Sequence, residues 1–209
     1  MFSSVSWLQT GGSIKSVLRL LSEQYLTSPP DSAMLPENQF RARPMKESEK
    51  VQFWLMKSEP SVYSIQDLQR DGKTAWEGVR NYQARNFMRD EMQVGDLVLF
   101  YHSNADPSGV AGVAKIAGKA YPDAAAFDRK SRYFDERSTP EKPLWFLVDV
   151  AFVAAFKEIL PLEKIKQAKE LEGIMVVKRG MRLSIQPVSE AHFKHVCHLA
   201  GCRMPGNEA

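Results

Sequence analysis

The sequence predicts a single compact domain of the mixed α+β class, with a barrel-like sheet rather than a doubly wound one. The chain has 209 residues, of which 44% are apolar, and this is enough for one sizeable core. Runs of strand length alternate with short helical patterns. The regular strand–helix–strand repeat of a doubly wound sheet is missing, which points to the α+β class.

Charge and cysteine content narrow the classes of function. The net charge of +3 is well short of that of a protein that coats nucleic acid, so any contact with nucleic acid should be local. Two cysteines give no disulfide framework and suit a reducing compartment. No apolar run approaches the roughly 18 to 20 residues that span a bilayer, so we expect no membrane partner.

The first 50 residues differ from the rest of the chain. They are rich in serine and then in proline, and residues 14–21 have the pattern of a short amphipathic helix with basic and no acidic side chains. A targeting segment would explain this pattern, but such segments are usually richer in arginine. We therefore predict a disordered or non-native extension over residues 1–50, including a start upstream of a natural one at Met45. The domain then covers residues 51–203, and a tail covers 204–209.

The ordered chain is expected to begin with Val51–Met56, an apolar and aromatic run of strand length. The run ends in Lys57–Pro60, where proline stops the strand and three polar side chains gather at its end. Ser64 is a typical N-cap for a helix over Ile65–Arg70, and Gly72 ends that helix.

The stretch Trp76–Ser103 is the centre of the chain. It predicts a helix from about Tyr82 to Met92 with Asn81 as its N-cap, then a turn at Gly95-Asp96 and a buried strand over Leu97–Tyr101. Its Trp, Tyr, His, Arg and Asn side chains can stack on a planar ring, hydrogen-bond the edge of the ring and neutralise phosphate. This combination favours a base-binding pocket over a catalytic centre.

The second half of the chain supplies further strands around a polar segment. Gly109–Gly118 is expected to be a strand whose glycines allow close backbone approach or a bulge. Residues 121–142 mix acidic and basic side chains, which is typical of a surface loop with a short helix, and would be available to a nucleic-acid backbone. The apolar run Leu144–Phe156 predicts a central strand pair or one long, bent strand.

The C-terminal part is expected to close the core. Pro161–Ile165 begins a helical turn, and Met175–Val177 and Leu183–Ile185 are short strand candidates. Ser189 begins a final helix that runs to about Ala200. Its apolar stripe at helical spacing would pack on the core and consists of Phe193, Val196, Cys197 and Ala200.

A metal site is one interpretation of the final helix, because His195, His198 and Cys202 lie at i, i+3 and i+7. A fourth ligand is missing, and Cys202 lies beyond the helix stop at Gly201. Zinc sites usually take their ligands from two separate elements. We therefore expect the polar face of a packing helix here, and no metal.

Signals for an enzyme are weak. The sequence has no phosphate-binding loop, dinucleotide fingerprint, metalloprotease motif or serine-hydrolase motif, and His102 has no nucleophile at diagnostic spacing. Lys57 beside Glu59 is compatible with acid–base chemistry, since a partly buried lysine next to a carboxylate can have a shifted pKa. An ordinary ion pair at a strand end explains the same residues. We predict no catalytic residue and no cofactor.

The aromatic side chains of the central stretch have two interpretations. Trp76, Tyr82 and Tyr101 could be core residues. The polar residues around them would leave many donors to satisfy inside a core, which favours a site for a planar ligand instead. These neighbours are Arg80, Asn81, Arg85, His102 and Ser103.

Four segments of the chain resemble the EVE domain family. They are WLMKSEP from Trp54, WEGVRNYQAR from Trp76, GD from Gly95 with FYHS from Phe100, and RLSI from Arg182 with PVS from Pro187. They occur in order between about Phe53 and Gly201, so the resemblance is specific. Gly180 departs from it, because a polar side chain is expected before the Met-Arg-Leu-Ser run. The resemblance implies a PUA-like fold, a curved β-barrel flanked by short helices.

The resemblance also implies a reader of modified bases, with modified cytosine in DNA, such as 5-methylcytosine or 5-hydroxymethylcytosine, as the expected ligand. A flipped base would stack on Trp76 or Tyr82, and Ser58 or Asn81 would read its edge. Arg80, Arg85 and neighbouring basic residues would contact phosphates. The expected nucleobase-binding residues are Lys57, Ser58, Glu59, Trp76, Val79, Arg80, Asn81, Tyr82, Arg85, Tyr101, His102 and Ser103.

Our hypothesis from the sequence is therefore a non-enzymatic, monomeric reader of a modified base, with DNA favoured over RNA as its partner. We expect it in the cytoplasm of a bacterium, or in the nucleus of a eukaryote. The alternative is a small hydrolase of modified nucleosides, as in ASCH-type relatives, with Lys57 and Glu59 in catalytic roles. A third option is an interaction module with a vestigial pocket.

Overall fold

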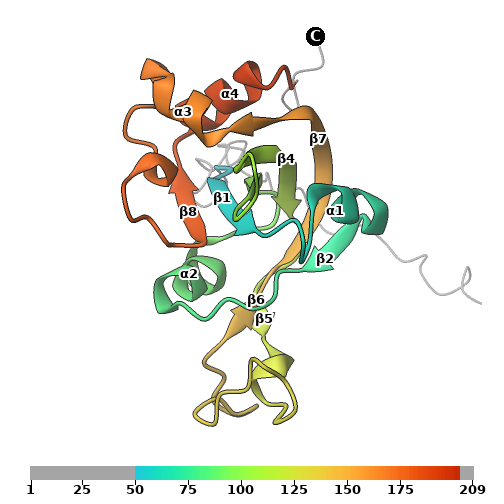
Figure 1. Cartoon of the computed structure of the whole chain (residues 1–209). Coiled ribbons are helices and arrows are strands. Elements are labelled where there is room, and N and C mark those ends of the chain that lie inside the picture. Colours follow the sequence, from blue (N-terminus) through green and yellow to red (C-terminus); the bar gives the residue numbers. More distant parts are fainter. Residues whose placement is uncertain (1–49, 203–209) are drawn as a thin grey trace, which may run out of the picture. The chain divides into compact units, whose positions relative to one another are not determined.

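The centre of the fold is a six-stranded sheet that curls into a half-barrel (Figure 1). The computed structural model describes residues 50–202. β1 and β3 run parallel, and the other neighbouring strands run antiparallel. In sheet order the strands are β2 (Lys73–Ala75), β7 (Asp149–Pro161), β4 (Gly109–Ile116), β3 (Leu97–His102), β1 (Phe53–Ser58) and β8 (Ile185–Val188).

This architecture confirms the predicted α+β class and the PUA-like curved barrel with short helices. The sheet is open, with β2 and β8 as its two edges. No helix among the described residues is long and apolar enough to cross a membrane. The predicted extension over residues 1–50 lies outside the described residues except for residue 50, as do residue 203 of the predicted domain and the tail over 204–209.

The sheet is buried on both faces, which explains why its central strands are continuous apolar runs. Side chains alternate along a strand, so Trp54 and Met56 of β1 join one core cluster and Leu55 joins the other. The first cluster includes residues of α1 (Ile65–Asp71), α2 (Tyr82–Asn86) and the π-helix η3 (Phe87–Glu91). The second includes residues of α3 (Leu162–Gln167) and α4 (Glu190–Leu199).

The longest strand, β7, curves the sheet. Its 13 residues pair with β2 near one end and with β4 along most of their length. The register between β4 and β7 shifts twice, and such bulges bend a strand and increase its twist. Of the two interpretations of the apolar run after Leu144, one long bent strand is therefore confirmed, preceded by the short β6 (Phe146–Leu147).

Two predicted helix starts are confirmed in detail. Ser64 forms a capping box with Asp67 at the start of α1. The Asn81 side chain accepts a hydrogen bond of 3.1 Å from the Ala84 amide, which caps α2. The helix predicted to about Met92 is continuous in the chain, but its second half has π-helical hydrogen bonding, with the Met92 amide bonded to the Phe87 carbonyl at 2.8 Å.

The turn before β3 is stabilised by a buried carboxylate. Asp96 is 2% exposed and accepts three hydrogen bonds of 2.9 Å, from the backbone amides of Gln52 and Gln93 and from the indole Nε1 of Trp54. Because hydrogen bonds to an ionised acceptor are stronger than neutral ones, Asp96 ties the start of β1 to this turn.

Two strand predictions in the C-terminal part need correction. Met175–Val177 is a 3-10 helix (η6), not a strand, because its backbone bonds locally and Val176 packs into the second cluster. A run of three apolar residues is too short to reveal its period. The second predicted strand begins only at Ile185, as β8. Polar Lys73–Ala75 carried no strand signal, yet it pairs with β7 as β2.

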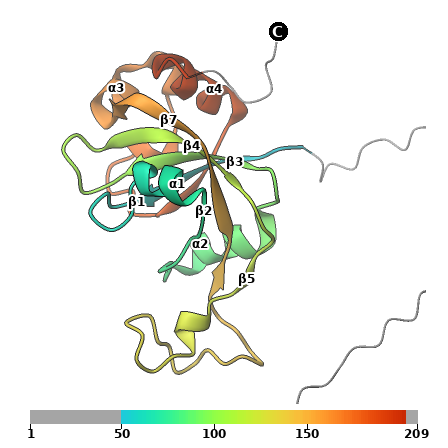
Figure 2. The same cartoon turned by 90° about the vertical axis from the view of Figure 1, so that its right-hand side faces the viewer.

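Residues 121–147 form an arm that projects from the sheet, on the side away from α3 and α4 (Figures 1 and 2). At its base β5 (Tyr121–Pro122) pairs with β6. The arm contains the short 3-10 helix η4 (Ala124–Ala126), in agreement with the predicted surface loop with a short helix. A further 3-10 helix, η5 (Lys169–Leu171), follows α3.

Candidate functional site

A cavity of about 350 Å³ lies between the end of β1, strand β2 and the arm. This volume falls within the range of sites that hold small ligands. Its walls combine aromatic, charged and small side chains from segments far apart in the sequence. The lining residues are Lys57, Ser58, Val62, Tyr63, Thr74, Ala75, Trp76, Glu77, Arg132 and Tyr133.

The end of β1 supplies a cation to the cavity. The Lys57 ammonium donates a hydrogen bond of 3.0 Å to the Met181 carbonyl, and an ammonium has two further donors. Desolvation by burial lowers the pKa of Lys57. The Ser58 hydroxyl donates to the Tyr63 carbonyl at 2.7 Å, so its oxygen remains as an acceptor. Lys57 is therefore the principal donor at this end of the cavity.

The turn that holds Met181 in place also explains the unusual residue before it. Gly180 has a φ of +75°, in the left-handed region that glycine adopts without strain. The Met181 amide closes this turn on the Lys178 carbonyl at 3.1 Å. Glycine at this position is thus a requirement of the backbone that presents the Met181 carbonyl to Lys57.

Trp76 belongs to the core as well as to the cavity. It is 7% exposed, and its ring meets Phe100 edge-on with centroids 5.5 Å apart. Only a small part of the ring is therefore available to a ligand. The other aromatic lining residues are Tyr63, whose hydroxyl donates to Asp71 at 3.0 Å, and Tyr133 of the arm. Neither tyrosine was among the expected binding residues, because neither belongs to the segments on which that expectation was based.

Glu77 adds an acidic residue to the lining of the cavity. It is exposed and follows Trp76 directly. Within residues 50–202, no side chain forms a hydrogen bond or ion pair with its carboxylate. Glu77 lies within the stretch Trp76–Tyr82 that was expected to form the pocket, but it was not among the named binding residues, although a carboxylate beside the central tryptophan is a visible signal for an acceptor.

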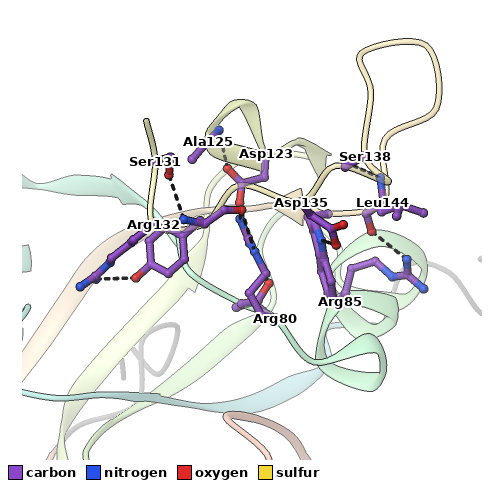
Figure 3. Close-up of polar contacts among 12 residues, drawn as sticks. Arg80, Arg85, Asp123, Ala125, Ser131, Arg132, Asp135, Ser138 and Leu144 are labelled. Carbon is purple, nitrogen blue, oxygen red and sulfur yellow. Dashed lines mark hydrogen bonds and ion pairs between the residues drawn. The ribbon is translucent and has the colours of Figure 1, made fainter. Parts of the chain in front are cut away.

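Arg80 crosses from the segment before α2 to the arm (Figure 3). Its guanidinium donates to the Asp123 carboxylate at 2.8 Å and to the Tyr133 carbonyl at 2.7 and 3.3 Å. Its carbon Cζ lies 4.9 Å from the ring centroid of Tyr133 and 5.2 Å from that of Trp145. The Arg80 head group is thus engaged inside the protein.

Arg85 makes a second connection to the arm (Figure 3). Its guanidinium donates to the Leu144 carbonyl at 2.7 Å and lies 5.0 Å from the centroid of the Tyr82 ring. Tyr82 in turn stacks on Trp145, with centroids 5.0 Å apart and an angle of 20° between the rings. Tyr82 and Arg85 therefore support the arm, while Asn81 caps α2, and none of the three lines the cavity.

The end of β3 is structural in this fold. His102 is 3% exposed, and its Nε2 accepts a hydrogen bond of 3.1 Å from the Ile65 amide at the start of α1. Desolvation lowers the pKa of His102, which favours the neutral ring that this bond requires. Tyr101 packs in the second core cluster, and the Ser103 amide donates to the Ser58 carbonyl at 2.8 Å.

The remaining predicted residues also lie beside the cavity rather than in its lining. Val79 is buried in the first core cluster. The Glu59 carboxylate accepts a hydrogen bond of 2.8 Å from Asn104. The structure thus brings Lys57, Ser58 and Trp76 of the predicted set into the cavity wall and places the other nine residues around it.

The histidines of α4 have partners of their own. His195 Nε2 lies 3.6 Å from a carboxylate oxygen of Glu170, and the His195 and His198 rings are 6.1 Å apart. In the described part of the chain, no group of three or more His, Cys, Asp or Glu side chains is arranged to hold a metal ion.

A half-barrel sheet flanked by short helices, with an aromatic and charged cavity at the end of β1, defines a PUA-like domain. The chain belongs to the EVE domain family, whose model matches residues 52–199. The resemblance read from the sequence is therefore confirmed.

Named relatives agree with this assignment. The chain is 42% identical over 164 residues to thymocyte nuclear protein 1 of Homo sapiens, a match that covers 70% of this chain and 72% of the relative. A crystal structure of a Pseudomonas syringae protein is 48% identical, with a TM-score of 0.68, over 71% of this chain and 99% of that one. The human THYN1 protein in complex with DNA containing 5-methylcytosine is 39% identical, with a TM-score of 0.65, over 74% of this chain and 99% of that one.

Proposed function

We propose that the protein is a reader of modified DNA that takes a modified cytosine out of the double helix and into the cavity beside Trp76. The observation that carries the proposal is the cavity itself, which is lined by aromatic side chains, by Lys57 and by Glu77. The human relative crystallised with 5-methylcytosine DNA supports the choice of ligand.

The charges of the cavity match the polar edge of cytosine. Cytosine presents its N4 amino group as a donor and its N3 and O2 atoms as acceptors. Glu77 is a suitable acceptor for the amino group, and a carboxylate is a known partner of cytosine N4. Lys57 supplies donors for the acceptor atoms. Thymine would turn its O4 acceptor toward the Glu77 carboxylate, so this arrangement rejects thymine.

The modification would meet the apolar part of the wall. Val62, Ala75 and Trp76 line the cavity with apolar atoms. Burying one methyl group contributes about 0.8 kcal/mol, which corresponds to roughly fourfold in affinity. We therefore expect a modest preference for 5-methylcytosine over cytosine from contact alone. A lower cost of unstacking a modified base would add to it.

Phosphate contacts would come from the arm, because Arg80 and Arg85 are engaged internally. Arg129, Lys130 and Arg132 are exposed on the arm, and Arg132 also lines the cavity. Extruding a base costs a few kcal/mol and stacking it returns about 1 to 3, so these cations are needed for useful affinity. Binding should consequently weaken as salt rises.

The test is direct binding of the full chain to matched duplexes at one salt concentration. The duplexes carry cytosine, 5-methylcytosine, 5-hydroxymethylcytosine or thymine at a single central position, and fluorescence anisotropy reports the affinity. We expect tightest binding to a modified cytosine. Glu77→Gln should lose about 1 to 3 kcal/mol of discrimination between cytosine and thymine. Equal affinity for all four duplexes contradicts the proposal.

A matched control separates the cavity from general electrostatics. Glu163→Gln removes the same charge from α3, the helix that packs on the second core cluster. The Glu163 side chain is 72% exposed. It should leave the discrimination between bases unchanged. If both glutamate variants change affinity for every duplex by the same factor, Glu77 acts only through net charge and does not read the base.

A hydrolase of modified nucleosides is the second candidate, and the lowered pKa of Lys57 at the cavity favours it. Glu59, the partner expected from the sequence, is bonded to Asn104 instead. Incubation with acylated cytidines followed by mass spectrometry distinguishes the two functions. Turnover that is lost in Lys57→Ala would identify an enzyme.

A monomeric state and a cytoplasmic or nuclear location stay predictions.

A further inference from the structure

We infer that Arg80 is a positioning residue. Its contacts with Asp123 and Tyr133 hold the arm beside the cavity, and this placement of the arm makes the site selective for the modified base. The inference rests on the proposed function. It assigns Arg80 a role different from the phosphate contact expected of a basic residue in this motif. Its consequence is that the arm, through Tyr133, is part of the base-recognition wall.

The first observation is how completely Arg80 is used. Its guanidinium makes hydrogen bonds to Asp123 and Val79 and two to the Tyr133 carbonyl. Its side chain is 24% exposed and lies over the rings of Tyr133 and Trp145. Few donors remain for a phosphate, since guanidinium has five N–H groups in all.

The second observation is the partner at the base of the arm. Asp123 is 2% exposed at its side chain, and one carboxylate oxygen bonds Arg80 while the other accepts from the Ala125 amide at 2.9 Å. The Asp123 amide donates to the Trp145 carbonyl at 2.9 Å, which closes the base of the arm. A buried carboxylate of this kind needs its cation, so the ion pair holds both strands of the arm to the body of the domain.

The third observation is the fit between the arm and the cavity rim. Gly78 has a φ of +77°, and a Cβ atom at this position would lie 2.6 Å from the Tyr133 hydroxyl oxygen. The turn after Glu77 is thus shaped to admit the tyrosine. Arg132 donates to the same hydroxyl. Tyr133 is therefore held by its carbonyl through Arg80 and seated by its ring against Gly78.

These contacts predict different roles for Arg80, which positions the arm, and for the exposed basic residues of the arm, which contact phosphates. Without Arg80, the Arg85 and Tyr82 contacts still hold the Leu144–Trp145 side of the arm. The other side loses the Asp123 ion pair and the contacts to the Tyr133 carbonyl, so the cavity loses the wall formed by Tyr133 and Arg132. An extruded base would then be exposed to water on one side, and its modification would no longer be enclosed. The arm's exposed cations would still reach phosphates, so binding without selectivity should survive.

The experiment measures the affinities of the wild-type protein and of Arg80→Gln for duplexes with 5-methylcytosine or cytosine at several salt concentrations. We expect the ratio of the two affinities to fall to within about twofold of one, while the dependence on salt stays unchanged. Loss of a phosphate contact would instead lower the salt slope by about 0.9 and keep the ratio. Hydrogen exchange over residues 121–147 should show faster opening of the arm in the variant.

Three further variants make the result specific. Tyr133→Ala removes the wall directly, and combining it with Arg80→Gln should cause no additional loss of selectivity. Arg80→Gln with Asp123→Asn removes both charges, so it leaves no buried charge unpaired, and it should show the same loss while remaining folded. Arg137→Gln is the control, because Arg137 is exposed and its ion pair is with Asp135, inside the arm; it should keep the ratio.

The outcomes distinguish this inference from the proposed function. If the unmodified protein shows no preference among the duplexes, the proposed function fails and the inference fails with it. If the unmodified protein is selective and Arg80→Gln is equally selective, the inference alone is overturned. A lowered salt slope with full selectivity would likewise return Arg80 to the role of a phosphate contact.

Discussion

His102 offers a sensitive test of the structural account, because its ring is hydrogen-bonded inside the domain, at the start of α1. Its Nε2 accepts a hydrogen bond from the Ile65 amide, and both residues are buried. The bond needs a neutral ring, since protonated Nε2 is a donor. Acidification should therefore destabilise the domain by protonating His102 in the unfolded chain first.

The sign and size of the effect follow from the lowered pKa. The unfolded chain takes up the proton near pH 6.5, above the pKa of the folded state, so stability is full above that pH and is lost as the pH falls below it. A difference of one proton changes the free energy of unfolding by about 1.4 kcal/mol per pH unit. Between pH 7.5 and pH 5.5 the loss is at most about 1.4 kcal/mol, the value for a ring that stays neutral in the folded state over this interval.

Urea unfolding at a series of pH values measures this loss. His102→Gln removes the titrating ring, so the stability difference between the two proteins should shrink as the pH falls over the same interval, by up to about 1.4 kcal/mol. His198→Gln, at an exposed site on α4, serves as the control and should follow the unmodified protein. Parallel curves for the unmodified protein and His102→Gln would refute a buried, neutral His102.

The remaining predictions concern three other positions. Asp96→Ala should cost about 3 to 5 kcal/mol in unfolding free energy, because it leaves three donors without their ionised partner, whereas Asp96→Asn should cost clearly less; an equal cost would contradict the account. Gly78→Ala should lower the melting temperature through a strained φ costing about 1 kcal/mol and should displace Tyr133; an unchanged protein with full base selectivity would argue against the seat at Gly78. Trp76→Ala should cost about 3 to 5 kcal/mol in unfolding free energy as a core truncation, and Trp76→Phe much less; an alanine variant that stays folded and keeps full preference for the modified base would contradict a site beside Trp76.

Much of the fold was accessible from the sequence because its signals are local. The caps at Ser64 and Asn81, the turn at Gly95 and the apolar runs of β1 and β3 each follow from side-chain chemistry or periodicity. β2 was missed because its short sequence, Lys-Thr-Ala, becomes a strand only through pairing with β7. Met175–Val177 was misassigned because packing, not propensity, decides a run of three residues.

The site was harder to predict for the same reason. Lys57 and Trp76 line the cavity as expected, and they come from the segments with the clearest family resemblance. Tyr133 reaches the cavity from more than 50 residues away, and only the fold of the arm brings it there. Polar neighbours of Trp76 suggested a ligand site, but Arg80 and Asn81 satisfy their donors and acceptors on the arm and on a helix end. Sequence proximity alone cannot separate such internal partners from a ligand.

The most direct measurement of the central claim is the NMR signal of a duplex whose single 5-methylcytosine carries a ¹³C-labelled methyl group. If the base enters the cavity, the bound methyl resonance should shift strongly from its position in free DNA, because aromatic rings enclose it, and should show contacts to Ala75 and Val62 protons. A methyl signal that keeps its free position while the duplex is fully bound would show that the base stays in the helix, and would contradict the account.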